Sequence, residues 1–472
     1  MRTANKLSYL RQEHPTFVYD NFTLQHEKEG LRITFQFKTE PDFIFQPSIC
    51  IGSVDQSRLN SLPTSVINNF AFHLGLVEML SYWKATCSPT IVIRPAYLSE
   101  DQLDWWKRLL LHGMGEYFYV NGIDYRDDDF VKIKSIGTQQ YHHDRSSHQD
   151  RDLVLTSGGK DSALTAQLYR EMGVEFQCLH VNPTPAAKLI AHSAGCDSPI
   201  TIDRLIDPAL LKLNTQDYLN GHIPFSASLA IIGITAAFLF DYNKVVVSNE
   251  RSCEEGNVTF LGEEINHQYS KTFRFEEDLR NYSRTYLSKD ISYFSILRPL
   301  YEIQIAGLFS NYPPYFNIFK SCNRNQADNS WCMNCVKCAF VFCALYPFLG
   351  SSQVEKIFGQ DIFECERAIP LFKELISEDT HKPFECVGTR AEILASLYLS
   401  IRKALRYHTR LPRVLAHIQQ HILPRYPDTP RVAEQLIRSW SDEHYIPNKY
   451  VSFLQNRTRS LNLRYESWGA TG

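Results

Sequence analysis

The chain contains 472 residues, of which 44% are hydrophobic and 21% are charged, and its formal net charge at pH 7 is −3. This length and composition predict roughly two to four globular domains with buried cores and exclude a disordered, collagenous or coiled-coil protein. The slightly acidic balance provides no overall basic field, so we expect no nucleic-acid partner unless a local basic patch supplies the charge.

Neither the N-terminus nor the most apolar segment points to secretion or to a membrane. Residues 1–14 lack the apolar stretch and small-residue cleavage site of a secretory signal, so we expect a cytoplasmic protein. Residues 218–240 contain no Asp, Glu, Lys or Arg, but only 225–240 are helix-compatible throughout, and this stretch is shorter than the roughly 20 residues that cross a bilayer. We therefore expect a buried helix at this position.

Residues 1–148 are predicted to form an α+β domain. Residues 1–60 cluster β-branched and aromatic residues between polar turns, which is typical of strands. A helical pattern follows over 62–86, and the apolar run at 90–95 indicates another strand. The polar segment 135–152 has no apolar periodicity, so we expect it to be the linker to the next domain.

Residues 149–350 are predicted to form a doubly wound α/β domain. Four short apolar runs, which we interpret as strands, lie at 152–156, 174–181, 198–202 and 244–249. Between the first two runs, Leu164, Leu168 and Met172 recur at helical spacing, and Gly173 is expected to end the helix. Strands that alternate with helices favour a parallel sheet with helices on both faces.

The segment from Ser157 to Ser162, with the sequence SGGKDS, lies between the first strand and this helix. Two adjacent glycines let the backbone turn sharply and approach an anion, and the following helix presents the positive end of its dipole there. We therefore predict a phosphate-binding loop, in which Asp161 reaches Mg²⁺ through water. The loop is not a Walker A motif, because Asp161 replaces Ser/Thr after Lys160. An ordinary strand-to-helix turn is the alternative. The predicted phosphate ligands are Ser157, Gly158, Gly159, Lys160, Asp161 and Ser162.

This loop resembles that of the PP-loop ATP pyrophosphatase superfamily, whose members cleave ATP to AMP and pyrophosphate. The resemblance implies ATP and Mg²⁺ as ligands, with the pyrophosphate portion on the loop and the adenosine near His180 and Asn182, beyond a neighbouring strand end. A loop that holds the outer phosphates leaves the α-phosphorus open to an oxygen nucleophile.

Four cysteines form a closely spaced cluster, C-x9-C-x2-C-x2-C, made by Cys322, Cys332, Cys335 and Cys338. This spacing is typical of a tetrahedral metal site, and it resembles the zinc cluster of 7-cyano-7-deazaguanine synthase, another PP-loop enzyme. We expect a structural Zn²⁺; an iron–sulfur cluster and four buried free thiols are the alternatives. Most remaining cysteines are expected to be core residues rather than disulfide partners. They are Cys50, Cys87, Cys178, Cys196, Cys343, Cys365 and Cys386.

Residues 250–279 follow the last predicted strand and are dense in Glu, Asn, His and Lys. Polar chemistry at the open end of a doubly wound sheet indicates an active site, although a solvated loop and helix would give a similar pattern. Acid and base candidates are Cys253, Glu254, Glu255, Glu263, Glu264 and His267. A phosphate site could lower the pKa of Cys253, which otherwise would be an inert small residue. His267 has a structural alternative, and Lys271 and Arg274 are candidates for anion binding or for the surface.

Several motifs together resemble the UDP-N-acetylmuramoyl-L-alanyl-L-glutamate epimerase family of bacterial peptidoglycan synthesis, from about residue 15 to 460. The motifs are AFHLGLVEMLSYWKATCSP, GMGEYFYVNGID, SNERSCEEGN, GEEINHQYSKTFRFE, YFSILRPLYE and WCMNCVKCAFVF. The resemblance implies an epimerase that consumes ATP, releases AMP and pyrophosphate, and converts a terminal L-glutamate to D-glutamate. A carboxyl-adenylate fits this chemistry, because it removes one negative charge and so makes the neighbouring α-carbon acidic.

Residues 351–472 are predicted to be helical and contain a basic tract that lacks acidic residues between 402 and 427. Its cations are Arg402, Lys403, Arg406, Arg410, Arg413 and Arg425. They could meet the UDP-muramoyl dipeptide, an RNA or only water. The aromatic pairs Tyr82–Trp83 and Trp105–Trp106 could stack on a uracil or pack in the core. Rival functions are a PP-loop enzyme that activates a tRNA base, a 7-cyano-7-deazaguanine synthase-like enzyme acting on a small carboxylate, and an ATP-binding sensor. The sequence predicts no particular oligomeric state.

Overall fold

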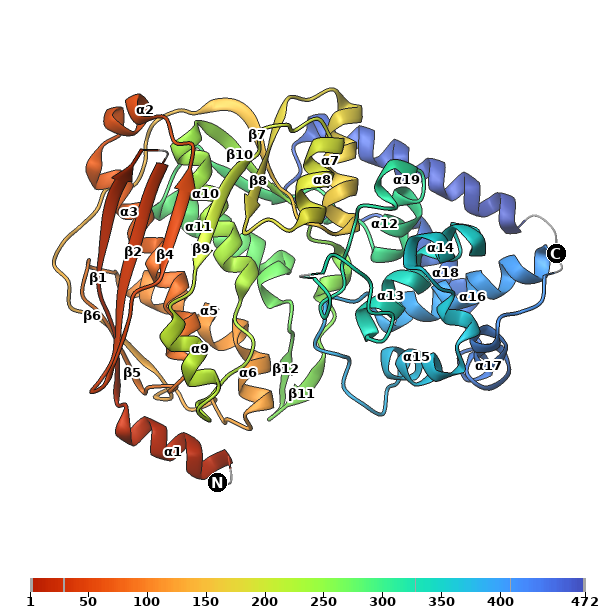
Figure 1. Cartoon of the computed structure of the whole chain (residues 1–472), viewed down its shortest axis with the longest axis horizontal. Helices are drawn as coiled ribbons and strands as arrows, with labels where there is room; N and C mark the ends of the chain where they lie inside the picture. Colours follow the sequence, from red (N-terminus) through yellow and green to blue (C-terminus); the bar gives the residue numbers. More distant parts are fainter. Residues whose placement is uncertain (1–2, 29, 327, 408, 470–472) are drawn as a thin grey trace.

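One large sheet forms the left half of the molecule in Figure 1, and a group of helices forms the right half. The computed structural model describes residues 3–28, 30–326, 328–407 and 409–469. The sheet has 11 strands in the order β13-β10-β7-β8-β9-β4-β2-β1-β5-β6, with β3 paired to β2. These strands are β1 (Thr16–Glu27), β2 (Gly30–Thr39), β3 (Phe43–Phe45), β4 (Ser48–Gly52), β5 (Thr90–Ile93), β6 (Lys132–Ser135), β7 (Gln149–Leu155), β8 (Phe176–Val181), β9 (Ile200–Leu205), β10 (Tyr242–Val247) and β13 (Ser292–Ser295).

The strands β13, β10, β7, β8 and β9 are mutually parallel, so their carboxyl ends meet at one edge of the sheet. The first strands of the chain join this core through β4, which pairs antiparallel with β9. The sheet therefore continues without a break from residues before 148 to residues after it. This mostly parallel sheet and the helices around it confirm the predicted α/β fold class.

Alternating side chains of the central strands supply two separate cores, one on each face of the sheet. Leu153 of β7 and Val245 of β10 belong to one hydrophobic cluster, whereas Val154 and Val246 belong to the other. All four are fully buried. Burial on both faces explains why these strands appear in the sequence as continuous apolar runs rather than as alternating ones.

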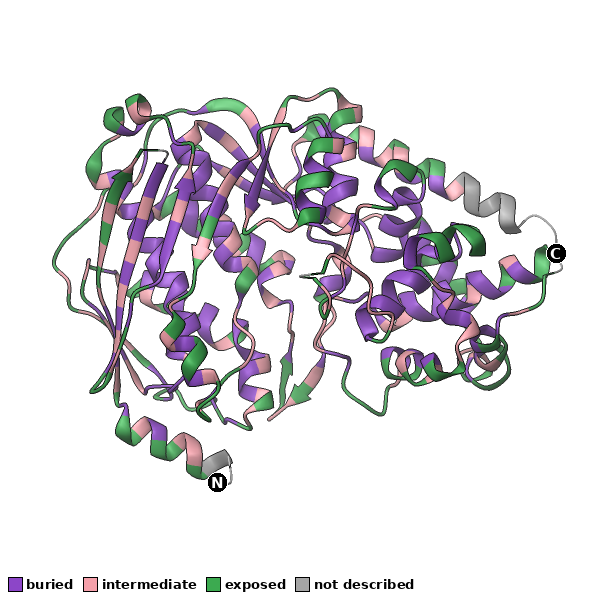
Figure 2. Cartoon of the chain, in the orientation of Figure 1, coloured by how far each residue is buried: buried purple, intermediate pink, exposed green. Residues whose placement is uncertain are grey.

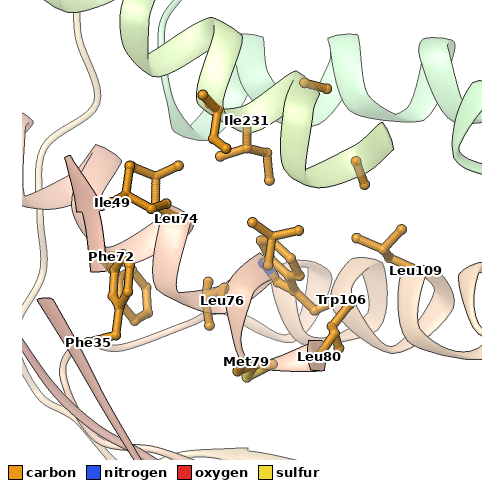
Figure 3. Packing of buried hydrophobic residues seen from close by; sticks show 14 of the residues in the cluster. Phe35, Ile49, Phe72, Leu74, Leu76, Met79, Leu80, Trp106, Leu109 and Ile231 are labelled. Atoms are coloured by element: carbon orange, nitrogen blue, oxygen red, sulfur yellow. The ribbon is translucent and has the colours of Figure 1, made fainter. Parts of the chain in front are cut away.

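The first core lies between the sheet and four helices, α3 (Thr64–Glu78), α5 (Glu100–Gly113), α10 (Phe225–Phe240) and α11 (Phe273–Tyr286). Figure 3 shows part of it, with Ile49 of the sheet, Leu74 of α3 and Ile231 of α10. Gly233 of α10 allows a close approach to the sheet, because a Cβ there would lie 2.8 Å from Val245 Cγ1. Helix α10 is the predicted buried helix. Within the described part of the chain, no helix has the length and apolar character needed to cross a bilayer.

The second core is covered by α7 (Lys160–Met172), α8 (Pro185–Ser193) and α12 (Glu302–Phe309), and it extends into the C-terminal helices. Figure 2 shows the buried inner faces of these helices in purple. The C-terminal helices are α13 (Val336–Leu345), α14 (Ser351–Phe358), α15 (Ile369–Ile376), α16 (Arg390–Arg406), α17 (Arg413–His421), α18 (Thr429–Arg438) and α19 (Asn448–Gly469). The predicted helical C-terminal region is therefore confirmed. Gly173, in the left-handed conformation, ends α7 as expected.

Some expectations for individual side chains were wrong. Cys178 and Cys196 are not two free core thiols but form a disulfide between β8 and the end of α8, with Cα atoms 6.0 Å apart. Helix α8 places Cys196 beside Cys178, and the spacing of these two cysteines in the sequence does not indicate that they are close. Within the polar segment 135–152, expected to be the linker, Asp144 and His148 are buried.

The two aromatic pairs pack in the core and do not form an exposed stacking surface. Tyr82 and Trp83 have no exposed area, and Trp105 and Trp106 are also buried. The Trp106 indole donates a hydrogen bond to the Tyr282 hydroxyl over 2.9 Å.

Candidate active site

The SGGKDS segment connects β7 to α7 at the carboxyl edge of the parallel strands. The Ser157 amide donates a hydrogen bond to Ser162 Oγ over 3.0 Å, which closes the loop. The N-cap is Gly159, so the cap itself places no side chain over the first N–H groups of α7. Gly158 is required by close packing, because a Cβ there would lie 2.9 Å from the Ala186 Cβ. This geometry leaves backbone donors and the positive end of a helix dipole facing one point.

Lys160 is buried at the start of α7 and lies between two carboxylates. Its Nζ contacts Asp161 in the loop and Glu302 at the start of α12. Burial opposes its positive charge, but these two carboxylates raise the pKa of Lys160 well above its usual range. One ammonium cannot balance both carboxylates in this dry environment. Burial and the charge of Asp161 accordingly raise the pKa of Glu302 to about 8.

Cys253 follows Ser252, whose hydroxyl accepts a hydrogen bond from the Glu302 amide, and its thiol contacts Arg298. Its thiol is fully buried and can donate its one proton to the carbonyl of Glu250 (2.9 Å) or of Lys271 (3.1 Å). Arg298 Nη1 lies 3.2 Å from the sulfur, but burial dominates and raises the pKa of Cys253 to about 12. The expectation that a phosphate site lowers this pKa was therefore wrong, because desolvation outweighs the nearby positive charge.

The acidic candidates next to Cys253 have structural partners or lie at the surface. Glu254 accepts a hydrogen bond from the Phe273 amide (2.6 Å) at the start of α11, and burial raises the pKa of Glu254. Glu255 forms an ion pair with Lys382 over 3.1 Å. Glu263 and Glu264 are exposed on β12 (Glu263–Ile265), which forms a small hairpin with β11 (Val258–Phe260). Arg274 is also exposed.

His267 belongs to a cluster that draws residues from distant parts of the chain. Its Nδ1 lies 2.5 Å from the Glu116 carboxylate, on α6 (Gly115–Val120), and its ring centre lies 4.2 Å from that of His222. Burial opposes protonation of His267, but hydrogen bonds to Cys386 and Glu116 raise its pKa to about 9. Burial and the charge of His267 lower the pKa of His222 to about 3. We interpret Glu116 and His267 as an ion pair in which the histidine is protonated, with a neutral His222 packed against it.

Cys386, expected to be an ordinary core residue, is half-buried beside His267. Lys271 Nζ lies 3.4 Å from its sulfur, and Lys337 donates a hydrogen bond to its carbonyl oxygen. Burial acts to raise the pKa of this thiol, but Lys271, His267 and Lys337 lower it to about 6. The charge of Asp161 also raises the pKa of Lys271, so the SGGKDS loop and Cys386 both act on this ammonium.

The two residues expected near a nucleoside have different surroundings. His180 is fully buried, and neither ring nitrogen has a hydrogen-bond partner in the part of the chain that is described. Burial lowers its pKa to about 4. The exposed Asn182 exchanges hydrogen bonds with the backbone of Arg204, at 3.0 and 3.1 Å, and so joins the ends of β8 and β9.

The four predicted cysteine ligands come together beside the phosphate loop. The sulfur atoms of Cys322, Cys332, Cys335 and Cys338 all lie within 4.8 Å of one another, so the cluster could bind a metal ion such as zinc. Backbone amides point at these sulfur atoms, as in the 3.4 Å contact from the Cys338 amide to Cys335 Sγ. Ser321, directly before this cluster, would lie 3.2 Å from a Cβ at Gly159. Metal binding would therefore order one wall of the loop.

The basic tract lies at the far end of the helical region, away from the strand ends (Figure 1). Arg410 and Arg413 form exposed ion pairs with Glu364 and Glu366. The Lys403 ammonium donates a hydrogen bond to the Pro347 carbonyl over 3.0 Å. These contacts favour a solvated helical face over a contact with the ligand of the loop.

The residues that sequence reasoning missed are mainly the partners of those it found. Glu302 and Arg298 stand within the motif YFSILRPLYE, and Glu116 within GMGEYFYVNGID, but nothing in either pattern shows which residues they contact. His222 and Cys386 are isolated in the sequence, and nothing around either residue indicated that it belongs to the site.

Comparison with known proteins identifies relatives along most of the chain. The family model described as the MurL N-terminal domain matches residues 9–296, and that of the MurL C-terminal domain matches residues 318–426. A protein of Micromonospora sp. named UDP-N-acetyl-alpha-D-muramoyl-L-alanyl-L-glutamate epimerase is 35% identical over 330 residues, which cover 69% of this chain and 73% of that protein. A protein of Xanthomonas oryzae pv. oryzae with the same name is 31% identical over 358 residues, covering 74% of this chain and 79% of the relative.

Proposed function

This chain belongs to the MurL family, and on that premise we propose that it epimerises the terminal L-glutamate of UDP-N-acetylmuramoyl-L-alanyl-L-glutamate to D-glutamate at the expense of ATP. One observation supports an ATP-dependent reaction most strongly. A loop suited to phosphate, with the buried Lys160, lies beside a cluster of acid–base groups at the same edge of the sheet. Such a site combines the activation of a carboxylate with proton transfer at the neighbouring carbon.

The loop residues would hold the outer phosphates of ATP. The amides at the start of α7 and the Lys160 ammonium are the donors, and Asp161 is placed to reach Mg²⁺ through water. An oxygen of the glutamate α-carboxylate would then attack the α-phosphorus, and the bond to pyrophosphate would break. The product of this step is a carboxyl-adenylate, and Mg²⁺ would stabilise the leaving pyrophosphate.

Activation changes the acidity of the α-carbon. A free carboxylate resists loss of the adjacent proton because two negative charges would become neighbours, whereas the adenylate delocalises the new charge as an enolate. A side-chain base can then remove the proton, and a proton added to the opposite face inverts the centre. Water finally cleaves the mixed anhydride and releases AMP.

The four-cysteine cluster would hold a structural Zn²⁺ in this account. Four thiolate ligands fill a tetrahedral zinc site and leave no position for substrate. Its contribution would be to keep Ser321 against Gly159, and so to fix the shape of the phosphate loop.

The test is a reaction of the purified protein with ATP, Mg²⁺ and the L-glutamate-terminated precursor, followed by hydrolysis and chiral analysis of the glutamate. We expect D-glutamate to form only when ATP is present, with AMP and pyrophosphate released. Unchanged L-glutamate, or D-glutamate formed without ATP, would contradict the proposal. The same pyrophosphate assay with deacylated tRNA and with small carboxylates tests the rival PP-loop activities. ATP binding without turnover of any substrate would instead indicate a sensor.

A further inference from the structure

Cys386 differs from the other cysteine of the site in the two properties that decide whether a thiol can exchange protons with a substrate. It is half-buried, whereas Cys253 is fully enclosed. Cationic and proton-donating groups contact it, with Lys271 Nζ at 3.4 Å and the His267 imidazole in hydrogen-bonding contact. The Cys253 thiol instead donates its one proton to a backbone carbonyl, which holds it in the neutral form.

Charged residues from several elements surround Cys386 and determine whether its thiol is ionised. Lys271 comes from the 3₁₀ turn η2 (Tyr269–Lys271) and Lys337 from α13, and both are positive. His267 is held protonated by the Glu116 carboxylate, while His222 stays neutral. The carboxylate of the neighbouring Glu385 is the opposing charge on the same segment. Lys271 and His267 beside the sulfur, with Lys337 at the carbonyl of the same residue, stabilise a thiolate, because a thiolate is favoured next to Lys, Arg or protonated His.

Lys271 relates this thiol to the phosphate loop. The charges of Cys386, Glu250 and Asp161 all act on its ammonium. A glutamate whose carboxylate reaches the α-phosphorus of a nucleotide on the loop would therefore lie in the same charged region as Lys271 and Cys386.

We propose that the Cys386 thiolate removes the α-proton of the activated glutamate, and that His267 relays that proton to solvent. This inference rests on the proposed epimerase function. The α-carbon–hydrogen bond breaks, the proton forms an S–H bond, and the electron pair enters the enolate of the activated carboxyl group. Water gives a proton to the opposite face and leaves hydroxide. The thiol then returns its proton through His267, which neutralises the hydroxide and restores the thiolate.

The test separates activation from proton transfer with the variant Cys386→Ala. We expect this variant to release pyrophosphate in the presence of the precursor at a rate within about threefold of the wild type. Exchange of the α-hydrogen with deuterated water, and formation of D-glutamate, should fall by at least ~100-fold, the lower limit for loss of a general base. Cys50→Ala is the matched control, because Cys50 is also half-buried but lies in the middle of β4 beside Arg32, where burial raises its pKa. It should keep both activities.

The outcomes distinguish the two proposals. If the wild type neither consumes ATP nor forms D-glutamate, the proposed function is wrong. If the wild type is an epimerase and Cys386→Ala exchanges the α-proton at the wild-type rate, only the role of Cys386 is wrong. If the variant does not fold, alkylation of the wild type by iodoacetamide decides. A thiolate predicts modification of Cys386 with a midpoint near pH 6 and protection by precursor with ATP, whereas a midpoint above pH 8 or no protection overturns the assignment.

Discussion

Replacing Lys160 by methionine removes the buried ammonium of the phosphate loop while nearly preserving its volume. The wild-type ammonium contacts both Asp161 and Glu302 and is almost completely shielded from water. Hydrogen bonds to charged groups contribute about 1.5–3 kcal/mol each, and Glu302, whose pKa is about 8, is already mostly protonated at pH 7 and so makes the weaker of the two contacts. We therefore expect the free energy of unfolding to fall by about 2–4 kcal/mol at pH 7, measured by urea titration.

The destabilisation should depend on pH in a defined direction. Burial and Asp161 raise the pKa of Glu302 to about 8 even with Lys160 present, and Lys160 lowers it. Without Lys160 this folded-state pKa moves above 8, farther from the unfolded value of about 4.3. When the pKa of a carboxyl group is higher in the folded than in the unfolded protein, the free energy of unfolding falls as pH rises, until the folded-state pKa is reached. Above pH 8 the variant should therefore lose about 1.4 kcal/mol per pH unit more than the wild type, until its own folded pKa is reached.

Activity is the decisive measurement for this variant. Loss of one preorganised donor to developing charge lowers kcat by about 10²–10³, so precursor-dependent pyrophosphate release should fall by that factor. The control is Lys244→Met. Lys244 is also buried and pairs with Asp152 over 3.3 Å, but it lies near the amino end of β10, at the opposite edge of the sheet. The Lys244→Met variant should lose a similar free energy of unfolding and keep its turnover. Equal turnover by Lys160→Met and Lys244→Met would refute the phosphate-binding role of the loop.

Three further changes test other parts of the structure. Cys335→Ser should release the metal and lower Tm by about 5 °C, with weaker ATP binding; a metal-free mass for the wild type and an unchanged melting curve would contradict a structural ion. Glu116→Gln removes the carboxylate that helps to raise the pKa of His267 to about 9, so the basic limb of the kcat/KM profile should move to lower pH by about one unit; an unmoved limb would disconnect this pair from catalysis. Burial opposes protonation of His148, but hydrogen bonds to Asp144 and Asp241 raise its pKa, so its contribution is present below the unfolded pKa and lost as pH rises through the folded one. Asp144→Asn should consequently lower Tm more at pH 6 than at pH 8, and equal losses would argue against the charged pair.

The sequence was sufficient for features that depend on local pattern. The length of the apolar run identified α10, and the double glycine with Lys160 identified the strand-to-helix loop within six residues. The four cysteines were found for the same reason, because spacing along the chain approximates spacing in the site.

Features that depend on long-range packing could not be predicted in the same way. The site joins Glu116 of α6, His267 after β12 and Cys386 before α16, and no periodicity relates these three positions. Cys253 shows the converse problem, because its polar neighbours in the sequence indicated a reactive thiol. Desolvation by burial decides its pKa against the opposing charge of Arg298, and burial of this kind is visible only in the fold.

Transfer of oxygen from substrate to nucleotide tests the activation step most directly. The precursor would carry ¹⁸O in both oxygens of the glutamate α-carboxylate, and the AMP formed would be analysed by mass spectrometry. A carboxyl-adenylate that water cleaves at the acyl carbon leaves one substrate oxygen on phosphorus, so we predict one ¹⁸O atom in each AMP, in proportion to the D-glutamate produced. D-glutamate formed together with AMP that contains no ¹⁸O would contradict activation of the carboxylate by the nucleotide on the loop.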